Sequence, residues 1–371
     1  FSLLDNSIEL IRELSKSHLI VCGGSNYRAL IASGIQPDFI TLIERADETY
    51  NTYKKIFDEF GPTTTKLITS TTCNDKLADL FDQTCVFFRP ALVPVSIFSE
   101  DRGDVITHEG PQAVCAAFSF AMYMQPEKVV LVGVDFGSSN LDQQRAEGAR
   151  GYSPRALSLE VPGNLRDKVY TDRRLLDCLE MLETRIRHNP KEIDTEVFNV
   201  SDGVKIEGTS PIQMNEYLNL FDSLDTFEDI QLIKDNWWNS LHNVDPIRMQ
   251  KLLMTKRPRE KSLELIERLR SLLKDDTLPW MPSLVEAIDN IFLLEHGRDI
   301  EEVPKKFIKS IVLILTNTIT QQLRIMNKSD DLRGKSILFL KFGKQLLLDE
   351  LDILEKEIYQ TFDYIDNTLL N

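Results

Sequence analysis

The sequence predicts an α/β fold: a Rossmann-like, mostly parallel sheet with helices on both faces, followed by an all-helical domain. Two observations lead to this prediction. Over residues 1–210, short apolar runs that end in glycine or polar residues alternate with segments of helical periodicity. From about residue 212, helical spacing continues without strand signals. We therefore expect two domains, residues 1–212 and residues 213–371.

The elements of the first domain follow one another along the chain. The expected strands are HLIVCGGSN (18–26), QPDFITLIER (36–45), TKLITST (65–71), TCVFFRP (84–90), 128–134 and EVFNVSDG (196–203). The expected helices are 7–17, YRALIASGI (27–35), 47–60, 74–82, GPQAVCAAFSFAMYM (110–124) and 172–188. Pro111 is placed near the start of its helix, where proline is favoured. This alternation favours parallel strands joined by right-handed crossovers.

The second domain contains segments of helical spacing and two loops. The loops are TKRPREKS (255–262) and KDDTLPWMPS (274–283), which are rich in charge and proline. The expected helical segments are 228–236, 246–254, 260–275, 281–296, 303–326 and 335–370.

Composition and charge limit the class of protein. The formal net charge of -15 argues against a general nucleic-acid binder, which needs a basic face. No apolar run approaches the ~20 residues that span a membrane. The chain begins at Phe1, so we expect its first domain to lack its N-terminal start. Five cysteines without a C-x-x-C pair predict buried free thiols in a reducing compartment, and hence a cytoplasmic protein without a zinc site: Cys22, Cys73, Cys85, Cys115 and Cys178.

Polar residues collect where the predicted strands end. These ends are CGGSN, ERAD, STTCN, DFGSSN and NVSDG. In open α/β sheets, ligands bind outside the carboxyl ends of the strands, so one shared polar pocket is expected. The alternative is that such residues serve as helix caps and turns, which also lie there.

Three of these segments suggest chemistry. VCGGSN resembles a phosphate-binding turn at a helix start near Asn26, although a tight packing turn fits equally well. THEGPQAV (107–114) offers His108 as a candidate general base, or simply a surface histidine. Asp135 directly follows an apolar strand, where it would bind sugar hydroxyls, act as a base or cap a turn.

Five ordered segments resemble the Maf family of motility-associated flagellin glycosyltransferases. They are IVCGGSNYRALIASGIQPDFITLIERAD (20–47), the helix GPQAVCAAFSFAMYM, VVLVGVDFGSSN (129–140), LEVPGNLRDKVYTD (159–172) and VFNVSDGVKIEGT (197–209). The resemblance covers residues 1–212 and extends to a sialyltransferase-like domain related to 6-hydroxymethylpterin pyrophosphokinases. It implies transfer of a nonulosonic acid, of the pseudaminic or legionaminic type, from a CMP-activated donor to Ser or Thr of flagellin. No cofactor or metal is implied.

The resemblance also implies roles for individual residues. Asp135 would act near the sugar and acceptor together with Asn199 and Glu207, and Tyr170 would donate to the leaving phosphate. His108 stays a candidate catalytic base. The residues expected to hold the donor are Gly23, Gly24, Ser25, Asn26, Glu44, Asp47, Gly110, Gln112, Ser138, Thr171, Asn199 and Glu207.

The chain departs from the family pattern at two places. Family members open this domain with a glycine-rich turn on an earlier strand, whereas this chain starts at FSLLDN. Many members also have a histidine where this chain has Arg145. A guanidinium group stays protonated, so Arg145 does not replace a histidine base.

Two other functions compete with sugar transfer. One is a pterin pyrophosphokinase that uses ATP and magnesium, which would require clustered aspartates. The other is a flagellin-binding chaperone or scaffold without turnover, in which the helical domain packs against a partner helix.

Overall fold

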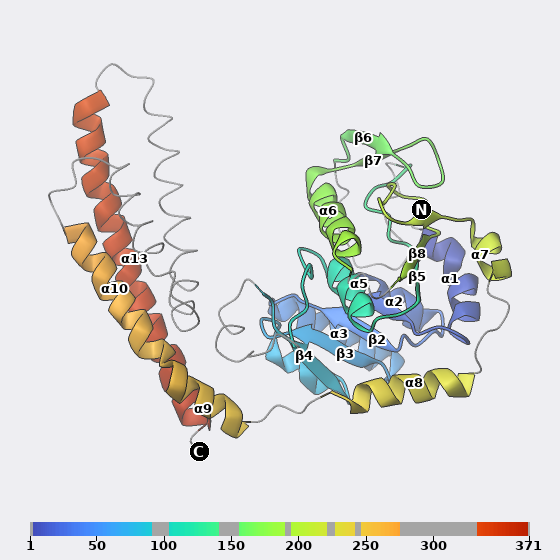
Figure 1. Cartoon of the computed structure of the whole chain (residues 1–371), viewed down its shortest axis with the longest axis horizontal. Coiled ribbons are helices and arrows are strands. Elements are labelled where there is room, and N and C mark those ends of the chain that lie inside the picture. The colour runs from blue at the N-terminus through green and yellow to red at the C-terminus, as the bar shows by residue number, and fades with distance from the viewer. Residues whose placement is uncertain are drawn as a thin grey trace. The chain divides into compact units, whose positions relative to one another are not determined.

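The computed structural model describes residues 3–90, 104–140, 156–189, 194–220, 227–241, 246–274 and 332–369 (Figure 1). The chain divides into two compact units. The first contains Phe1–Pro90 and Asp104–His242, and the second contains the helices from residue 246 onward.

The first unit contains a parallel sheet with the strand order β1-β2-β3-β4. The strands are β1 (Val21–Gly23), β2 (Phe39–Leu42), β3 (Lys66–Ser70) and β4 (Thr84–Phe87). They are connected by α2 (Gly24–Ala32), α3 (Asp47–Phe60) and the 3-10 helix η1 (Asp75–Leu80). The helix predicted over 74–82 is thus a 3-10 helix, and α2 starts two residues before Asn26.

Both faces of this sheet are buried. Ile40 and Leu42 face a core that includes α2, α3 and residues of α1 (Leu3–Leu14). Phe39 and Ile43 face the opposite core. Alternate side chains of a strand point to opposite faces, so the continuous apolar run of β2 reflects a sheet covered on both sides.

A second parallel sheet has the order β5-β8-β9. It contains β5 (Lys128–Leu131), β8 (Glu196–Asn199) and β9 (Ser210–Pro211), with α6 (Arg173–Arg187) before β8 and α7 (Met214–Leu220) after β9. The predicted fold class, a mostly parallel sheet with helices on both faces, is confirmed.

An antiparallel pair was not predicted. It joins β6 (Leu159–Pro162) to β7 (Lys168–Thr171), with Glu160 opposite Tyr170. Both strands are short, and β6 is mostly exposed and ends in a proline. Their sequences therefore lack the apolar run that identified the parallel strands.

Helix α5 (Ala113–Tyr123) is buried on nearly all sides. Ala116 and Phe120 pack against the first sheet, whereas Phe118 and Met122 pack in the core of the second sheet. A helix that is apolar all round belongs inside a fold. Pro111 precedes the helix and its N-cap Gln112, so it does not lie in the first turn as predicted.

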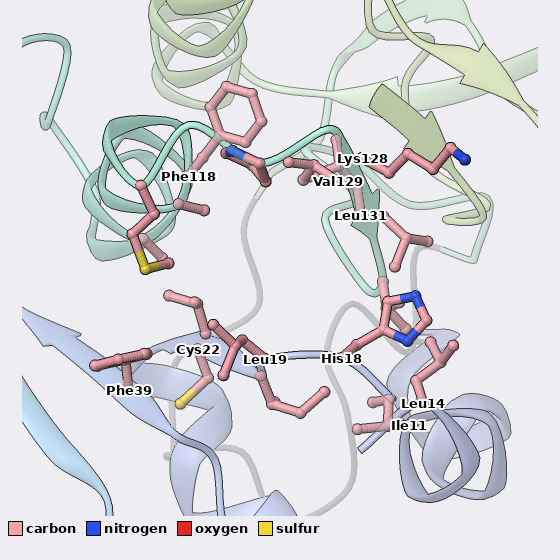
Figure 2. A pocket seen from close by; sticks show the side chains of 18 of the residues that line it. Ile11, Leu14, His18, Leu19, Cys22, Phe39, Phe118, Lys128, Val129 and Leu131 are labelled. Carbon is pink, nitrogen blue, oxygen red and sulfur yellow. The ribbon is translucent and has the colours of Figure 1, made fainter. Parts of the chain in front are cut away.

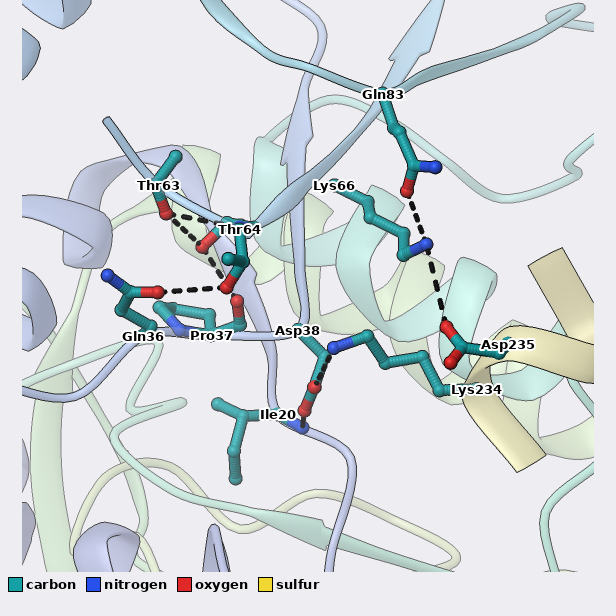
Figure 3. A network of polar contacts seen from close by, with 11 residues as sticks. Ile20, Gln36, Pro37, Asp38, Thr63, Thr64, Lys66, Gln83, Lys234 and Asp235 are labelled. Atoms are coloured by element: carbon teal, nitrogen blue, oxygen red, sulfur yellow. Dashed lines mark hydrogen bonds and ion pairs between the residues drawn. The ribbon is translucent and has the colours of Figure 1, made fainter. Parts of the chain in front are cut away.

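Helix α8 (Phe227–Asn239), also part of the first unit, is held beside the first sheet by a buried ion pair (Figure 3). Lys234 Nζ lies 2.9 Å from Asp38 Oδ1, and both side chains are at most 14% exposed. Asp38 Oδ2 also accepts a hydrogen bond from Ile20 N. Trp237 contacts Phe39 edge-on, so α8 also contributes to the apolar core.

The second unit contains α9 (Pro246–Lys256), α10 (Pro258–Lys274) and α13 (Leu332–Leu369). The loop predicted at TKRPREKS is wrong: only Arg257, in a left-handed conformation, separates α9 from α10. Pro258 is the first residue of α10, a position that does not need an N–H donor. The predicted helices 281–296 and 303–326 and most of the loop KDDTLPWMPS lie outside the described residues.

Helices α10 and α13 pack together along apolar rows. Their buried residues include Leu265, Ile266, Leu269, Leu273, Leu347, Leu351, Leu354 and Ile358. Arg270 of α10 pairs with Asp352 and Glu355 of α13.

All five cysteines are free thiols, and three of them are buried. Burial raises the pKa of Cys22 and, to about 11, the pKa of Cys85. The hydrogen bond with Cys178, together with burial, raises the pKa of Cys115. None of the described helices combines the length with the apolar composition that a membrane span requires.

We predict that Lys234→Met destabilises the protein by about 3 kcal/mol, because it leaves the Asp38 carboxylate buried without its cation. Lys168→Met is the control, since it removes a lysine from the exposed pair with Glu160 and should lower the stability far less. Urea denaturation measures both changes. Equal losses in the two variants would contradict a role for the buried pair.

Candidate functional site

The two parallel sheets define the point where ligands bind in this class of fold. Strand order runs outward from β1 in one sheet and outward from β5 in the other. Ligands of doubly wound folds bind at the carboxyl ends of the strands where this order reverses. The candidate site is therefore the region between the end of β1, at Gly23, and the end of β5, from Val132 to Asp135.

A cavity of about 580 Å³ lies between these two strands (Figure 2). Leu19 and Cys22 from the β1 side face Phe118 of α5 and Val129 and Leu131 of β5. Among the described residues, no strand pairing joins β1 to β5. The cavity has the size of a small-molecule pocket, and its walls are largely apolar. Polar groups at its edges include His18, Asn26 and Lys128.

The loop after β5 is held in an unusual conformation. Gly133 and Phe136, on either side of Asp135, have positive φ angles of 67° and 48°. The Phe136 ring is buried, and its carbonyl oxygen accepts a hydrogen bond of 2.6 Å from Thr171 Oγ1. A left-handed conformation is uncommon for a bulky residue and is held by the surrounding structure. The fold thus fixes the position of Asp135.

The segment NVSDG (199–203) packs closely against the backbone of Asp135. Val204 N donates a 2.7 Å hydrogen bond to the Asp135 carbonyl oxygen. A Cβ atom at Gly203 would lie 2.0 Å from the same oxygen. Only glycine permits this approach, so Gly203 sets the distance between β8 and the loop after β5.

Two asparagines beside Asp135 have fixed side-chain orientations. Asn164 Nδ2 donates to the carbonyl oxygens of Asn199 and Ser201 at 2.9 Å and 2.7 Å. Asn199 Oδ1 accepts a hydrogen bond from Ser201 N at 2.9 Å. An amide that uses its nitrogen in one contact must turn its oxygen elsewhere, and the reverse also holds.

These contacts leave three buried polar atoms unpaired within the described residues: Asp135 Oδ1, Asn164 Oδ1 and Asn199 Nδ2. A buried polar atom without a partner costs about 1–3 kcal/mol, so each calls for an explanation. We refer to Asp135, Asn164, Asn199, Ser201 and Asp202 as the Asp135 cluster. It presents two acceptors and one donor, a set that matches hydroxyl groups.

The surroundings of Asp135 shift its pKa toward neutral pH. Burial, with a contribution from the nearby Asp202 carboxylate, raises the pKa of Asp135 to about 7. Asp202 itself is paired with Arg166, whose Nε donates to Asp202 Oδ1 at 2.6 Å. Asp135 can therefore gain or lose a proton near neutral pH.

Three helices begin at the carboxyl edge of the first sheet without a side-chain cap among the described residues: α2, α3 and α5. In contrast, α6 is capped by Asp172, which accepts from Leu175 N. Uncapped helix starts leave N–H groups that favour anions. The starts of α2 and α5 are close together, because a Cβ atom at Gly23 would lie 3.2 Å from Val114 N.

The glycine pair before α2 also has a packing role. A Cβ atom at Gly24 would lie 2.5 Å from Tyr53 Oη, which donates to the Gly24 carbonyl oxygen at 2.6 Å. Gly23 lets α5 approach β1 closely. Both interpretations of VCGGSN, an anion site and a packing turn, are compatible with this geometry.

Other predicted donor residues lie on the same edge. Ser25 and Asn26 are in the first turn of α2, and Gly110 and Gln112 precede α5. Glu44 and Asp47 are exposed beyond β2, where the Asp47 carboxylate accepts a 2.7 Å hydrogen bond from Asn74 Nδ2.

The loop that carries Asp135 is flanked by Tyr170, Thr171 and Ser138. The backbones of Ser138 and Tyr170 exchange two hydrogen bonds, of 2.8 Å and 3.0 Å. Ser138 Oγ donates to the carbonyl oxygen of Asn140, and Thr171 Oγ1 donates to the carbonyl oxygen of Phe136. These residues hold the loop that carries Asp135.

The structure does not bring His108 and Glu207 to the Asp135 cluster. The His108 ring stacks on His188, the C-cap residue of α6. The backbone N–H of Glu207 donates a hydrogen bond to the Glu183 carboxylate near the end of α6. Glu207 is exposed and pairs with Lys205.

Four residues near Asp135 were not predicted as site residues: Asn164, Ser201, Asp202 and Gly203. The signal was present in NVSDG, a polar segment that follows a strand, and in the Asn of VPGN. Arg145 lies outside the described residues. Over the described ranges, no group of three or more His, Cys, Asp or Glu side chains is placed to hold a metal ion.

Comparisons with known proteins agree with this fold. Residues 2–141 match the family model "6-hydroxymethylpterin diphosphokinase MptE-like". The solved structure of a Maf glycosyltransferase from Magnetospirillum magneticum AMB-1 is similar, with a TM-score of 0.72, 22% sequence identity and 98% of this chain covered. The chain spans about half (54%) of the length of that protein. Among curated proteins, none matches this sequence.

Both parts of the resemblance inferred from the sequence are confirmed. The MptE-like model matches much of the first domain, and the chain has the fold of a Maf glycosyltransferase.

We predict that Asp135→Asn makes the protein more stable at pH 8 but not at pH 4. In the unfolded chain an aspartate loses its proton near pH 3.9, whereas in the folded protein Asp135 keeps it up to about pH 7. The unfolded state is therefore favoured as pH rises through this window, by on the order of 4 kcal/mol. Asparagine cannot ionise and avoids this loss.

Urea denaturation at the two pH values measures the effect. Asp82→Asn is the control, because it removes a carboxylate from an exposed position. If the two variants show the same dependence on pH, the high pKa assigned to Asp135 is wrong.

Proposed function

We propose that this chain, which has the fold of a Maf glycosyltransferase, transfers a nonulosonic acid from a CMP-activated donor to Ser or Thr hydroxyls of flagellin. Transfer would take place in the cytoplasm before flagellin is exported, and would serve flagellar assembly and motility. The single observation that carries the proposal is the set of unpaired buried atoms in the Asp135 cluster at the carboxyl ends of β5 and β8.

The Asp135 cluster suits a sugar better than an anion. Asp135 Oδ1 and Asn164 Oδ1 are acceptors, and Asn199 Nδ2 is a donor, whereas a phosphate group needs donors alone. The Asp202 carboxylate nearby adds negative charge, so the donor phosphate and the carboxylate of the nonulosonic acid would both lie outside the cluster. Sugar hydroxyls both donate and accept, so they can satisfy all three atoms.

The nucleotide part of the donor would lie toward β1. The uncapped starts of α2 and α5 offer N–H groups for its phosphate. Asn26 and Gln112 lie at these helix starts, and Glu44 and Asp47 follow β2, within reach of a ribose or a base in the proposed arrangement. The cavity between β1 and β5 is lined by Gly23 and Asn26 on the β1 side and by Val132 and Val134, just before Asp135, on the β5 side.

The proposed reaction is an inverting displacement. The oxygen of the acceptor hydroxyl forms a bond to the anomeric carbon, while the bond between that carbon and the phosphate oxygen breaks. Ionised Asp135 takes the hydroxyl proton, for which a pKa of about 7 is well matched. Tyr170, on β7 beside this loop, would donate a hydrogen bond to the departing phosphate.

We predict that Asp135→Asn lowers the rate of transfer by at least about 100-fold, since a positioned base contributes roughly that factor. The assay incubates the protein with flagellin and a CMP-nonulosonic acid and reads intact mass. Asp82→Asn is again the control and should retain activity. Unchanged transfer by Asp135→Asn would contradict the proposed role.

A wild-type protein that binds flagellin tightly but adds no mass would instead support the scaffold function. The helical second unit would then be the part that binds flagellin.

The match to the MptE-like model favours a second candidate, diphosphate transfer from ATP to a pterin alcohol. Ligand preference distinguishes the two functions. We predict that CMP raises the melting temperature, measured by thermal shift, by more than ATP with magnesium does at equal concentration. A larger shift with ATP and magnesium would favour the pyrophosphokinase.

A further inference from the structure

The end of α6 carries a basic cluster that the proposed reaction does not use. Arg185 and His188 are three residues apart, so they share one face of the helix end. The ring of His108 stacks on His188, with ring centroids 5.5 Å apart and an interplanar angle of 21°. Three side chains that can carry positive charge therefore come together from two separate segments.

Arg185 differs from the other arginine of this turn. It is half-buried, and no acidic side chain among the described residues lies within ion-pair distance of it. Burial lowers its pKa, which indicates an uncompensated charge. Arg187 is exposed instead and contacts Glu183 and Thr184. The negative end of the helix dipole favours cations in a last turn, but it does not require a buried and unpaired one.

The acidic residue next to His108 is already paired with another cation. Glu109 follows His108, but it is buried and paired with Arg89 at 2.7 Å. Its charge is therefore not available to Arg185. The cluster thus keeps a net positive charge within a chain whose formal net charge is -15.

The position of His108 is fixed by its backbone. Its φ angle is 62°, in the left-handed region, and its carbonyl oxygen accepts a 3.0 Å hydrogen bond from Ser119 Oγ. Burial lowers the pKa of His108, as do the neighbouring His188 and Arg185, against a smaller opposing effect of Glu109. A bound anion would reverse the effect of these neighbours and favour the protonated ring.

We propose that Arg185, His108 and His188 form a binding site for a compact oxyanion of the phosphate type. The guanidinium group would donate two parallel hydrogen bonds to oxygen atoms, and the two imidazoles would each donate one. The chemistry is that of a phosphate group, either free or as the monoester of a larger molecule.

This site is separate from the Asp135 cluster. Helix α6 begins beside Thr171, which holds the Asp135 loop, and ends at the basic cluster. Its 15 residues span about 22 Å at 1.5 Å per residue. The donor phosphate is assigned instead to the starts of α2 and α5, whereas His108 contacts Ser119, about 9 Å beyond the start of α5 at 1.5 Å per residue. The anion site is therefore a second position, and binding there does not require the proposed transfer.

The test uses the whole chain labelled with ¹³C at the histidine Cε1 atoms, titrated with inorganic phosphate at constant ionic strength. We predict saturable shifts of two histidine signals, which His108→Asn and His188→Asn identify. Arg185→Gln should weaken binding at least about ten-fold, because it removes the charge-assisted pair. Arg187→Gln, with the same charge change two residues away, should bind as the wild type does.

Further titrations identify the source of the phosphate. CMP that shifts the same two signals in the wild type but not in Arg185→Gln shows that a phosphate monoester fits this site rather than the start of α5, whereas a response to inorganic phosphate alone restricts the site to the free ion. The proposal is overturned if neither His108 nor His188 responds saturably, or if Arg187→Gln weakens binding as much as Arg185→Gln. Because His188 is exposed, His188→Asn gives a second test that does not disturb the core.

Discussion

The burial of helix α5 is the interaction on which the first unit depends. Its apolar residues face two different sheets, with Ala116 and Phe120 toward one and Phe118 and Met122 toward the other. Because no described strand pairing joins β1 to β5, α5 and α1 connect the two sheets through side chains alone. The cavity and the convergence of helix starts at Gly23 both follow from this arrangement.

Most of the fold could be predicted because its strands are covered on both faces. Every residue of β2 and β3 is buried, and α3 occupies the predicted range 47–60. The pair β6–β7 could not be predicted, since its stability comes from contacts that are distant in sequence, such as the bonds between Tyr170 and Ser138. The short connection at Arg257 was mistaken for a longer loop, because charged residues and proline occur both in loops and at helix starts.

The candidate site shows the same division. Asp135 lies four residues beyond the end of β5, and Asn199 is the last residue of β8, so their place at the sheet edge could be predicted from the apolar runs before them. The role of Asn164 depends on a loop that folds back on β8, and no local pattern encodes that contact. His108 precedes α5 in sequence, but its ring lies beside His188, because residues 107–109 run back along α5 to Ser119.

The packing of α5 against α6 also has a consequence for thiol chemistry. Cys115 Sγ lies 3.6 Å from the carbonyl oxygen of Cys178, and neither residue is exposed to solvent. A thiol reacts as the thiolate, which burial in this interface suppresses. Alkylation of Cys115 therefore requires α5 and α6 to separate. The alkylation rate in the native protein measures how often this separation occurs.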